Sequence, residues 1–213
     1  MTEQMPVLYD YWRSSASYRV RIALNLAGIE YRPVVVNLLD GSHRGQEHLA
    51  RNPQGLVPAL EIDGLMLTQS LAIVEYLIET RGLSLLPDDP PGRARARALA
   101  HAIAMDIHPV CNLSVVAHVM DITGGGAEAR SEWMKRFISQ GLAAFELMLD
   151  HADTGRFCHG NTVGLADICL IPQLYNADRW GVDISGMTRI NAVRQACEQL
   201  PAFARAHPDN NNF

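Results

Sequence analysis

Two adjacent serines, Ser14 and Ser15, lie between a predicted strand and a predicted helix, where their hydroxyl groups could bind or activate a ligand. Ser14 and Ser15 follow a short apolar and aromatic run at 7–12, which predicts a buried strand, and they precede a helical pattern at 17–27. Unpaired backbone N–H groups and the positive end of the dipole at a helix start favour an anion, and a serine hydroxyl can donate a hydrogen bond to it. Taken alone, the pair also suits a simpler role, which is to cap the helix.

The elements that position these serines alternate between strand and helix patterns. After the first strand and helix, the patterns predict a valine-rich strand at 31–38, a short helix at 46–51, strands at 59–62 and 65–68 around the hairpin signal Asp63-Gly64, and a helix at 70–80. This order favours a parallel pair of strands and a hairpin, covered by helices. Residues 1–86 are therefore expected to form an α/β domain.

The rest of the chain shows helical patterns alone. Residues 87–92 are rich in proline and aspartate and predict a linker. Beyond them, the patterns predict one long helix at 93–121 with a kink at Pro109, further helices at 128–150, 165–178 and 187–198, and a disordered tail at 208–213. The second domain, 93–213, is expected to be all-α.

Composition excludes several classes of partner. Of the 213 residues, 48% are hydrophobic and 19% are charged, and the net charge of −5 argues against nucleic acid or an acidic membrane surface as a partner. No apolar run approaches the roughly 20 residues of a membrane-spanning helix, and the N-terminus lacks the pattern of a signal peptide. We therefore expect a cytoplasmic protein.

The cysteines and histidines do not form the patterns of metal ligands. His101 and His108 lie seven residues apart, without an acidic or cysteine partner at ligand spacing. Four cysteines are scattered along the chain, as is typical of reduced and mostly buried thiols: Cys111, Cys158, Cys169 and Cys197. The sequence predicts no metal site.

Four local motifs together resemble those of one family over nearly the whole chain. They are SSASYRVRIAL at 14–24, NPQGLVPAL at 52–60, QSLAI at 69–73 and LADICLIPQ at 165–173. In this order and at these separations they are similar to motifs of the zeta-class glutathione transferases. The resemblance implies a thioredoxin-like domain that binds glutathione, followed by a helical domain that contributes the substrate site.

The resemblance also implies an activity. Zeta-class enzymes include isomerases that convert maleylacetoacetate to fumarylacetoacetate, or isomerise maleylpyruvate, with glutathione as a cofactor that is not consumed. It further implies a small dicarboxylate substrate, a role in aromatic catabolism and a homodimer. Two alternatives remain open at this point: a glutathione transferase or dehalogenase that acts on small α-halo acids, and a non-catalytic protein that binds glutathione.

By the family pattern, Ser14 is the first candidate for the contact with the glutathione sulfur, and Ser15 is the second. The family often has cysteine at the next position, where this chain has Ala16. Thiolate activation can survive that change because both hydroxyls remain.

The pattern assigns further residues to glutathione. Val57 precedes a proline that is cis in the family, and its backbone would pair with the cysteinyl portion. Gln69 and Ser70 would bind the γ-glutamyl carboxylate, and His43 lies near a position where the family has a glutamine.

In the helical half, three residues match a segment that faces the cleft in related enzymes: His108, Asn112 and Ser114. Arg13 and Arg179 match positions of arginines that bind substrate carboxylates, a task that suits the planar guanidinium.

One further departure concerns the start of the helix at 165. The family usually has serine or threonine three residues before the aspartate, and this chain has Gly164 before Asp167. Asp167 can still accept a hydrogen bond from the Gly164 amide, so half of the capping box remains, and we expect normal folding.

Overall fold

The structure, a computed structural model, describes residues 4–212 and divides into two compact units. The first contains residues up to Ser84 together with the segment from Leu200 onward, and the second is Leu85–Gln199. The division after Ser84 lies close to the predicted boundary at 86. The C-terminal segment packs with the first unit, although the sequence patterns place it in the helical domain.

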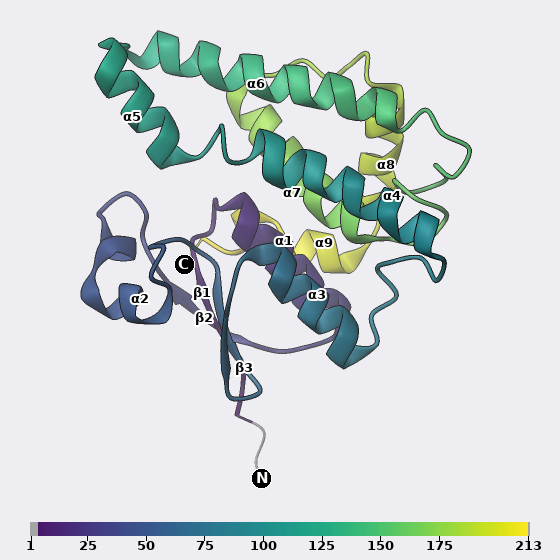
Figure 1. Cartoon of the computed structure of the whole chain (residues 1–213), viewed down its shortest axis with the longest axis horizontal. Helices are drawn as coiled ribbons and strands as arrows, with labels where there is room; N and C mark the ends of the chain where they lie inside the picture. Colours follow the sequence, from purple (N-terminus) through teal and green to yellow (C-terminus); the bar gives the residue numbers. More distant parts are fainter. Residues whose placement is uncertain (1–3, 213) are drawn as a thin grey trace. The chain divides into compact units, whose positions relative to one another are not determined.

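The first unit is built on a four-stranded mixed sheet (Figure 1). Its strands are β1 (Val7–Asp10), β2 (Arg32–Val35), β3 (Ala59–Ile62) and β4 (Leu65–Thr68), in the order β2-β1-β3-β4. β1 pairs with β2 in parallel and with β3 antiparallel, so that Leu8 lies opposite both Pro33 and Leu60. The predicted parallel pair and hairpin are confirmed, and β1, buried along its whole length, is the central strand.

Helices pack around this sheet. They are α1 (Ser15–Leu26), η1 (Ser42–Arg44), α2 (Gln46–Arg51), α3 (Ser70–Arg81), α9 (Pro201–Ala206) and η3 (Pro208–Asn210). α1 packs against both α3 and α9. It is the most enclosed helix of the unit: nine of its residues, from Ser15 to Leu24, are buried.

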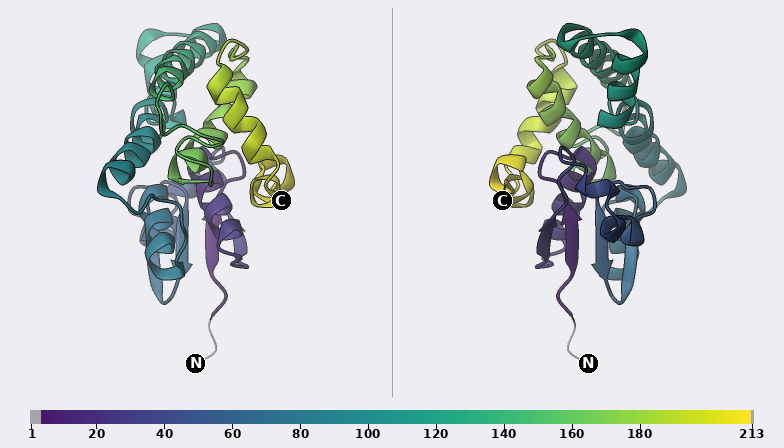
Figure 2. Two further views of the ribbon diagram at one scale, coloured as in Figure 1. Left: turned by 90° about the vertical axis from the view of Figure 1, so that its right-hand side faces the viewer. Right: turned by 90° about the vertical axis from the view of Figure 1, so that its left-hand side faces the viewer.

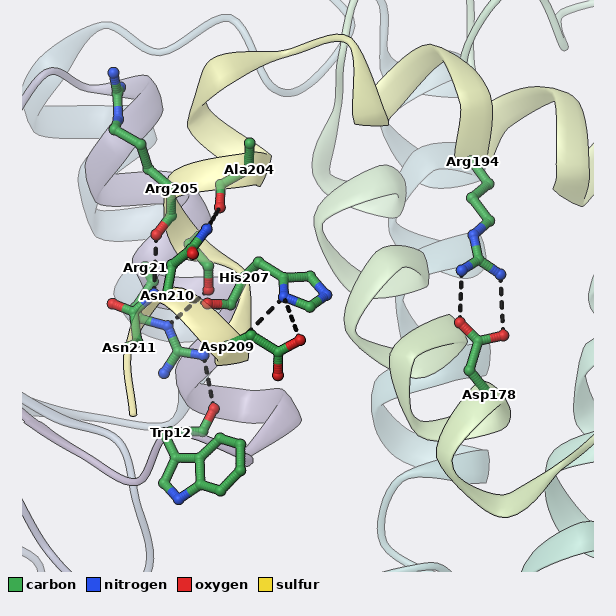
Figure 3. A network of polar contacts seen from close by, with 11 residues as sticks. Trp12, Arg21, Asp178, Arg194, Ala204, Arg205, His207, Asp209, Asn210 and Asn211 are labelled. Atoms are coloured by element: carbon green, nitrogen blue, oxygen red, sulfur yellow. Dashed lines mark hydrogen bonds and ion pairs between the residues drawn. The ribbon is translucent and has the colours of Figure 1, made fainter. Parts of the chain in front are cut away.

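Polar side chains of α1 hold the C-terminal segment in place (Figure 3). Arg21, which is fully buried, donates to the Asp10 carboxylate at 2.7 Å, to the Trp12 carbonyl at 2.9 Å and to the Ala206 carbonyl at 3.0 Å. One turn later, the Asn25 amide donates to the Ala202 carbonyl at 3.0 Å. The backbone of α9 thus pairs with one buried and one half-buried donor of α1, Arg21 and Asn25, which explains why this segment belongs to the first unit.

The tail that the sequence analysis predicts to be disordered is ordered over the described residues 208–212. The side chain of Asn210 donates to the Ala204 carbonyl, and that of Asn211 donates to the carbonyls of Arg205 and His207 (Figure 3). These amides satisfy carbonyls that the C-terminus of a helix leaves unpaired. The prediction is therefore wrong there, and Phe213 lies outside the described residues.

The second unit contains helices α4 (Pro90–His101), η2 (Ala102–Ile107), α5 (Leu113–Thr123), α6 (Ala127–Met148), α7 (Leu165–Trp180) and α8 (Thr188–Glu198). The predicted linker is partly helical, since α4 begins at Pro90 and the Asp89 side chain accepts from the Gly92 amide. α4 lies beside α7, and α6 turns back after the run of glycines that follows α5, and it packs against η2 (Figures 1 and 2). Arg194 of α8 binds the carboxylate of Asp178 of α7 through two nitrogens.

The single long helix predicted at 93–121 is wrong. α4 passes into the π-helical turn η2, the chain then turns at 108–111, and a new helix begins at Leu113. Pro109 cannot donate a backbone hydrogen bond, and the Asn112 side chain caps the new helix by accepting from the Ser114 amide at 3.0 Å. The predicted kink at Pro109 is a complete break.

Asp167 anchors the start of α7 from a fully buried position. Its carboxylate accepts hydrogen bonds from the Gly164 amide at 2.7 Å and from the Cys158 amide at 2.9 Å, while burial raises its pKa above the ordinary value. The predicted half of the capping box is confirmed. Because glycine has no side chain, the reciprocal bond of a full box is absent at Gly164.

Three features of the described residues relate to the expectations about membrane spans, cysteines and metal sites. No helix among them is long and apolar enough to cross a membrane. All four cysteines are unbridged and buried. No group of acidic, histidine and cysteine side chains that could hold a metal ion occurs in this part of the chain.

We predict that Gly164→Ser leaves the melting temperature unchanged or lowers it. A β-carbon at residue 164 would lie 3.2 Å from the Leu85 carbonyl oxygen, which already accepts from the Leu165 amide, so crowding offsets the few tenths of a kcal/mol that a serine cap adds. The matched control is Gly126→Ser at the N-cap of α6, where nothing lies within 4 Å and a small rise is expected. Thermal unfolding of both variants tests this; a rise for Gly164→Ser equal to that of the control would contradict it.

Close packing between α6 and η2 depends on a second glycine. A β-carbon at Gly141 would lie 2.4 Å from both Cγ1 and Cδ1 of Ile107, the last residue of η2. Gly141→Ala should therefore destabilise the protein by about 1–3 kcal/mol, despite the better helix propensity of alanine. Denaturant unfolding of this variant, of Ile107→Ala and of the double variant gives the coupling. Additive costs in the double variant would show that the contact is not the cause.

Candidate functional site

The serine pair lies at the start of α1, as predicted. Ser14 is the N-cap residue, and its Oγ accepts from the Ser17 amide at 3.2 Å, while its own amide donates to the Tyr11 carbonyl at 2.8 Å. A hydroxyl that accepts one hydrogen bond still has its O–H to donate. The capping role and a contact with an anion at the helix N-terminus are thus compatible at Ser14. Ser15 is buried as the first helical residue.

A second helix N-terminus lies in the same unit. Gln69 and Ser70 begin α3, which has no side-chain cap of its own. Gln69 has φ of +67°, a conformation that non-glycine residues rarely adopt and that is often found at functional sites. Ser70 is buried and accepts from the Arg19 guanidinium of α1 at 3.2 Å. A buried cation and the N-terminus of a 12-residue helix together favour an anion here.

The loop that leads to β3 presents backbone groups for pairing. The Val57–Pro58 bond is cis, as the motif implies. Val57 is 8% exposed, and neither its N–H nor its carbonyl forms a backbone hydrogen bond with another described residue. The Gln69 side chain donates to the Gln54 side chain at 2.7 Å, which ties the start of α3 to this loop. A peptide could therefore add beside Val57 as a further strand would.

His43 lies in η1, against the same loop. A β-carbon at Gly55 would lie 3.1 Å from the His43 carbonyl oxygen, so the two backbones approach closely, and Gly55 has φ of +62°. The His43 Nδ1 atom is buried and has no hydrogen-bond partner among residues 4–212. The place of His43 beside this loop and its unpaired Nδ1 atom suit a contact with a ligand.

In the second unit, the three predicted residues flank the break between η2 and α5. His108 follows η2, and its amide donates to the Ile103 carbonyl at 3.0 Å. The Ser114 hydroxyl donates to the Asn112 side chain at 2.9 Å. The indole of Trp133 donates to the Val110 carbonyl at 3.0 Å and so fixes the turn from α6. Asn112 and Ser114 thus have a helix-capping role that sequence spacing did not reveal.

The two arginines predicted to bind carboxylates have different surroundings. The Arg13 guanidinium stacks on the Trp12 ring at 4.2 Å, and its buried Nε has no acceptor among the described residues. Arg179 is exposed in the last turn of α7, with its guanidinium 5.6 Å from the centre of the Trp180 ring. Stacking on the Trp12 ring leaves the edge donors of the Arg13 guanidinium available for a carboxylate.

Three of the four thiols of the chain are poor nucleophiles. Burial raises the pKa of Cys111 to about 11, and it raises the pKa of Cys158 and of Cys197 as well. Only a thiolate attacks readily, so these groups stay protonated and inert at neutral pH.

Within the first unit, the structure links α1, α3 and the loop at 52–58, and so connects most of the predicted glutathione-binding residues. Sequence reasoning missed the residues that make these links: Arg19, His48, Asn52 and Gln54. Asn52 and Gln54 stand inside a quoted motif, whereas nothing in the spacing marks His48. Each acts through a contact with a residue distant in sequence or with a backbone carbonyl, which a local pattern does not report.

Comparison with known proteins gives the relatives of this chain. Family models match residues 6–79, described as "Glutathione S-transferase, N-terminal domain", and residues 131–205, described as "Glutathione S-transferase, C-terminal domain". The chain is 64% identical over 204 residues to a maleylacetoacetate isomerase of Rhizobium meliloti, covering 95% of this chain and 96% of that one.

Solved structures agree with this relationship. A bacterial maleylpyruvate isomerase, described as a glutathione transferase of the zeta class, has a TM-score of 0.93 at 41% identity, covering 96% of this chain and 97% of that one. A maleylacetoacetate isomerase from Methylobacterium extorquens AM1, with bound malonate and glutathione, has the same TM-score at 43% identity and the same coverage. The chain belongs to the glutathione S-transferase family, in its zeta class.

Proposed function

We propose that this protein is a glutathione-dependent isomerase that converts the cis double bond of maleylacetoacetate to trans. The observation that carries the proposal is the 64% identity over 95% of the chain to a maleylacetoacetate isomerase. The helix N-termini at Ser14 and Ser70, which favour an anion, support it. Maleylpyruvate is the second candidate substrate, because the structure of a maleylpyruvate isomerase matches with a TM-score of 0.93.

Glutathione would bind along the first unit. Its γ-glutamyl carboxylate suits the start of α3 at Gln69 and Ser70, and its cysteinyl portion suits the backbone of Val57. Its sulfur would lie at the start of α1, where the Ser14 hydroxyl donates to the thiolate and Ser15 adds to the polar surroundings. Such stabilisation lowers the pKa of the thiol, and one unit corresponds to about 1.4 kcal/mol.

The chemistry follows from the thiolate. The sulfur adds to the alkene carbon β to the carbonyl, so that a carbon–sulfur bond forms and the electron pair of the double bond passes to the carbonyl oxygen as an enolate. The former double bond is now single and rotates. When the enolate collapses, the double bond re-forms as trans and the thiolate leaves, so glutathione is not consumed. Donors aimed at the enolate oxygen would lower the barrier most.

The substrate carries a carboxylate at each end, and we assign its recognition to Arg13 and Arg179. A guanidinium binds a carboxylate with two hydrogen bonds and so fixes the ends while the middle of the substrate rotates. The uncommitted Nε of Arg13 supports this assignment. For His108, Asn112 and Ser114 of the second unit we keep the role in glutathione binding that the family pattern implies.

We also propose that the protein forms a homodimer and works in the cytoplasm. β4 is an edge strand of the sheet, and its apolar residues Leu65 and Met66 are 46% and 38% exposed. An edge with exposed apolar side chains favours contact with another chain. The buried, unbridged cysteines fit a reducing compartment.

The substrate prediction is tested with freshly made maleylacetoacetate and trace glutathione. We expect rapid turnover, followed by the ultraviolet absorbance with fumarylacetoacetate hydrolase present, and no net loss of glutathione. If the protein turns over maleylpyruvate and not maleylacetoacetate, the proposed substrate is wrong, whereas the proposed mechanism still holds. Release of halide from dichloroacetate, without isomerisation of either substrate, would identify the dehalogenase alternative and overturn the isomerase.

The serine prediction concerns which hydroxyl contacts the sulfur. Ser14→Ala should lower kcat/KM by about tenfold or more and raise the pKa of the bound thiol by about one unit, since one hydrogen bond to the thiolate is lost. The matched control is Ser15→Ala, for which we expect a smaller change in both quantities. Titration of the thiolate absorbance in the glutathione complex measures the pKa. A larger shift for Ser15→Ala would reverse the assignment of the two serines.

A further inference from the structure

The carbonyl of Leu56 accepts hydrogen bonds from two buried side chains. His48 Nε2 lies 2.9 Å from the carbonyl oxygen, and Asn52 Nδ2 lies 2.8 Å from it. The two residues are 3% and 2% exposed and stand four positions apart, His48 in α2 and Asn52 just beyond its end. A carbonyl oxygen has two lone pairs, so both are occupied.

We propose that His48 is a positioning residue for glutathione, acting through the peptide plane between Leu56 and Val57. This rests on the proposed function, in which the backbone of Val57 pairs with the tripeptide. Nothing in the sequence motifs assigns His48 a role, and the residue itself need not contact the ligand.

Peptide geometry connects the two residues. The cis bond of this loop is Val57–Pro58, and the preceding Leu56–Val57 bond is trans. A trans peptide is planar, and its C=O and N–H point in opposite directions. Holding the Leu56 oxygen against α2 therefore aims the Val57 N–H away from α2. That N–H has no backbone acceptor among the described residues, so it is available for a ligand carbonyl.

Asn52 alone does not fix this plane. Its side chain also accepts from the Gln54 amide at 3.1 Å, and its carbonyl accepts from the Gly55 amide at 2.9 Å, so it organises the turn as a whole. The imidazole supplies a second donor from another direction. For this bond Nε2 carries the proton, and the buried Nδ1 has no partner among residues 4–212. The Nε2–H group of His48 thus donates its hydrogen bond to the Leu56 carbonyl.

A purely structural role makes a different prediction. If His48 only stabilised the loop or the fold, its loss would lower stability and disturb every property of the site together. If it positions Val57, its loss weakens glutathione binding while the sulfur, held at the start of α1, keeps its environment. The affinity for glutathione and the pKa of the bound thiol separate the two cases.

The test compares His48→Phe, which keeps an aromatic ring without a donor, with His48→Gln, whose amide replaces the Nε2 donor. The control is Glu47→Gln on the same helix, where the exposed Glu47 pairs with Arg51 alone. We expect His48→Phe to weaken glutathione binding, measured by calorimetry, by about three- to tenfold, the worth of one hydrogen bond. The pKa of the bound thiol should stay at the wild-type value, and His48→Gln should restore most of the affinity.

Wild-type affinity in His48→Phe would overturn the inference, as would a loss of affinity accompanied by a shifted thiol pKa. A second measurement uses the unaltered protein, in case His48→Phe does not fold. Glutathione should slow hydrogen exchange at the Val57 amide and leave the Gly55 amide, already bonded to Asn52, unchanged. An unprotected Val57 amide in a protein that binds glutathione refutes the inference alone, whereas a wild type that does not bind glutathione refutes the proposed function with it.

Discussion

The arrangement of the first unit depends on one buried ion pair, between Arg21 and Asp10 at 2.7 Å. Both groups are removed from water, where a charge needs a partner: Asp10 Oδ2 accepts from Arg21, while the buried Oδ1 has no hydrogen-bond partner among the described residues. The other guanidinium nitrogens bind the carbonyls of Trp12 and Ala206, so a single side chain connects the end of β1, the loop after it and α9. Loss of either partner would leave an unpaired buried charge, which costs about 3–5 kcal/mol in proteins.

This constraint has a consequence for the site. The carbonyl of Trp12 lies two residues before Ser14, and Arg13 between them stacks on the Trp12 ring. The path of the chain into α1 is therefore fixed on both sides: by Arg21 at Trp12, and by the Ser14 amide bound to Tyr11 with its hydroxyl bound to Ser17. A serine whose backbone is held in this way can present its O–H without rearrangement when an anion binds, and such preorganisation is what makes electrostatic stabilisation effective.

Sequence patterns predicted most of the fold because its signals are local. The hairpin at Asp63-Gly64, the helix at 70–80 and the cis bond before Pro58 are each specified by neighbouring residues or by a motif. The patterns failed where distant residues decide. Nothing local shows that Asn25 and Arg21 bind the backbone of α9. The break of the long helix is a different case, because Pro109 and the Asn112 cap are local signals that the sequence analysis read as a kink only. The same limit applies to the site: Ser14, Gln69 and Arg19 stand in motifs, but only the folded structure shows that Arg19 binds Ser70, and His48 stands in no motif.

The polar groups gathered in the first unit explain how an acidic protein can bind an acidic tripeptide. The chain carries a net charge of −5, and glutathione as a thiolate is also negative, so overall charge opposes the complex. The local field is of the opposite sign, because two helix N-termini, the guanidiniums of Arg13 and Arg19 and the N–H of Val57 are all donors. All four thiols of the chain are buried, and burial raises the pKa of Cys111, Cys158 and Cys197. The proposed site would therefore stabilise a thiolate that arrives with its ligand, and the proposed reaction needs no further nucleophile.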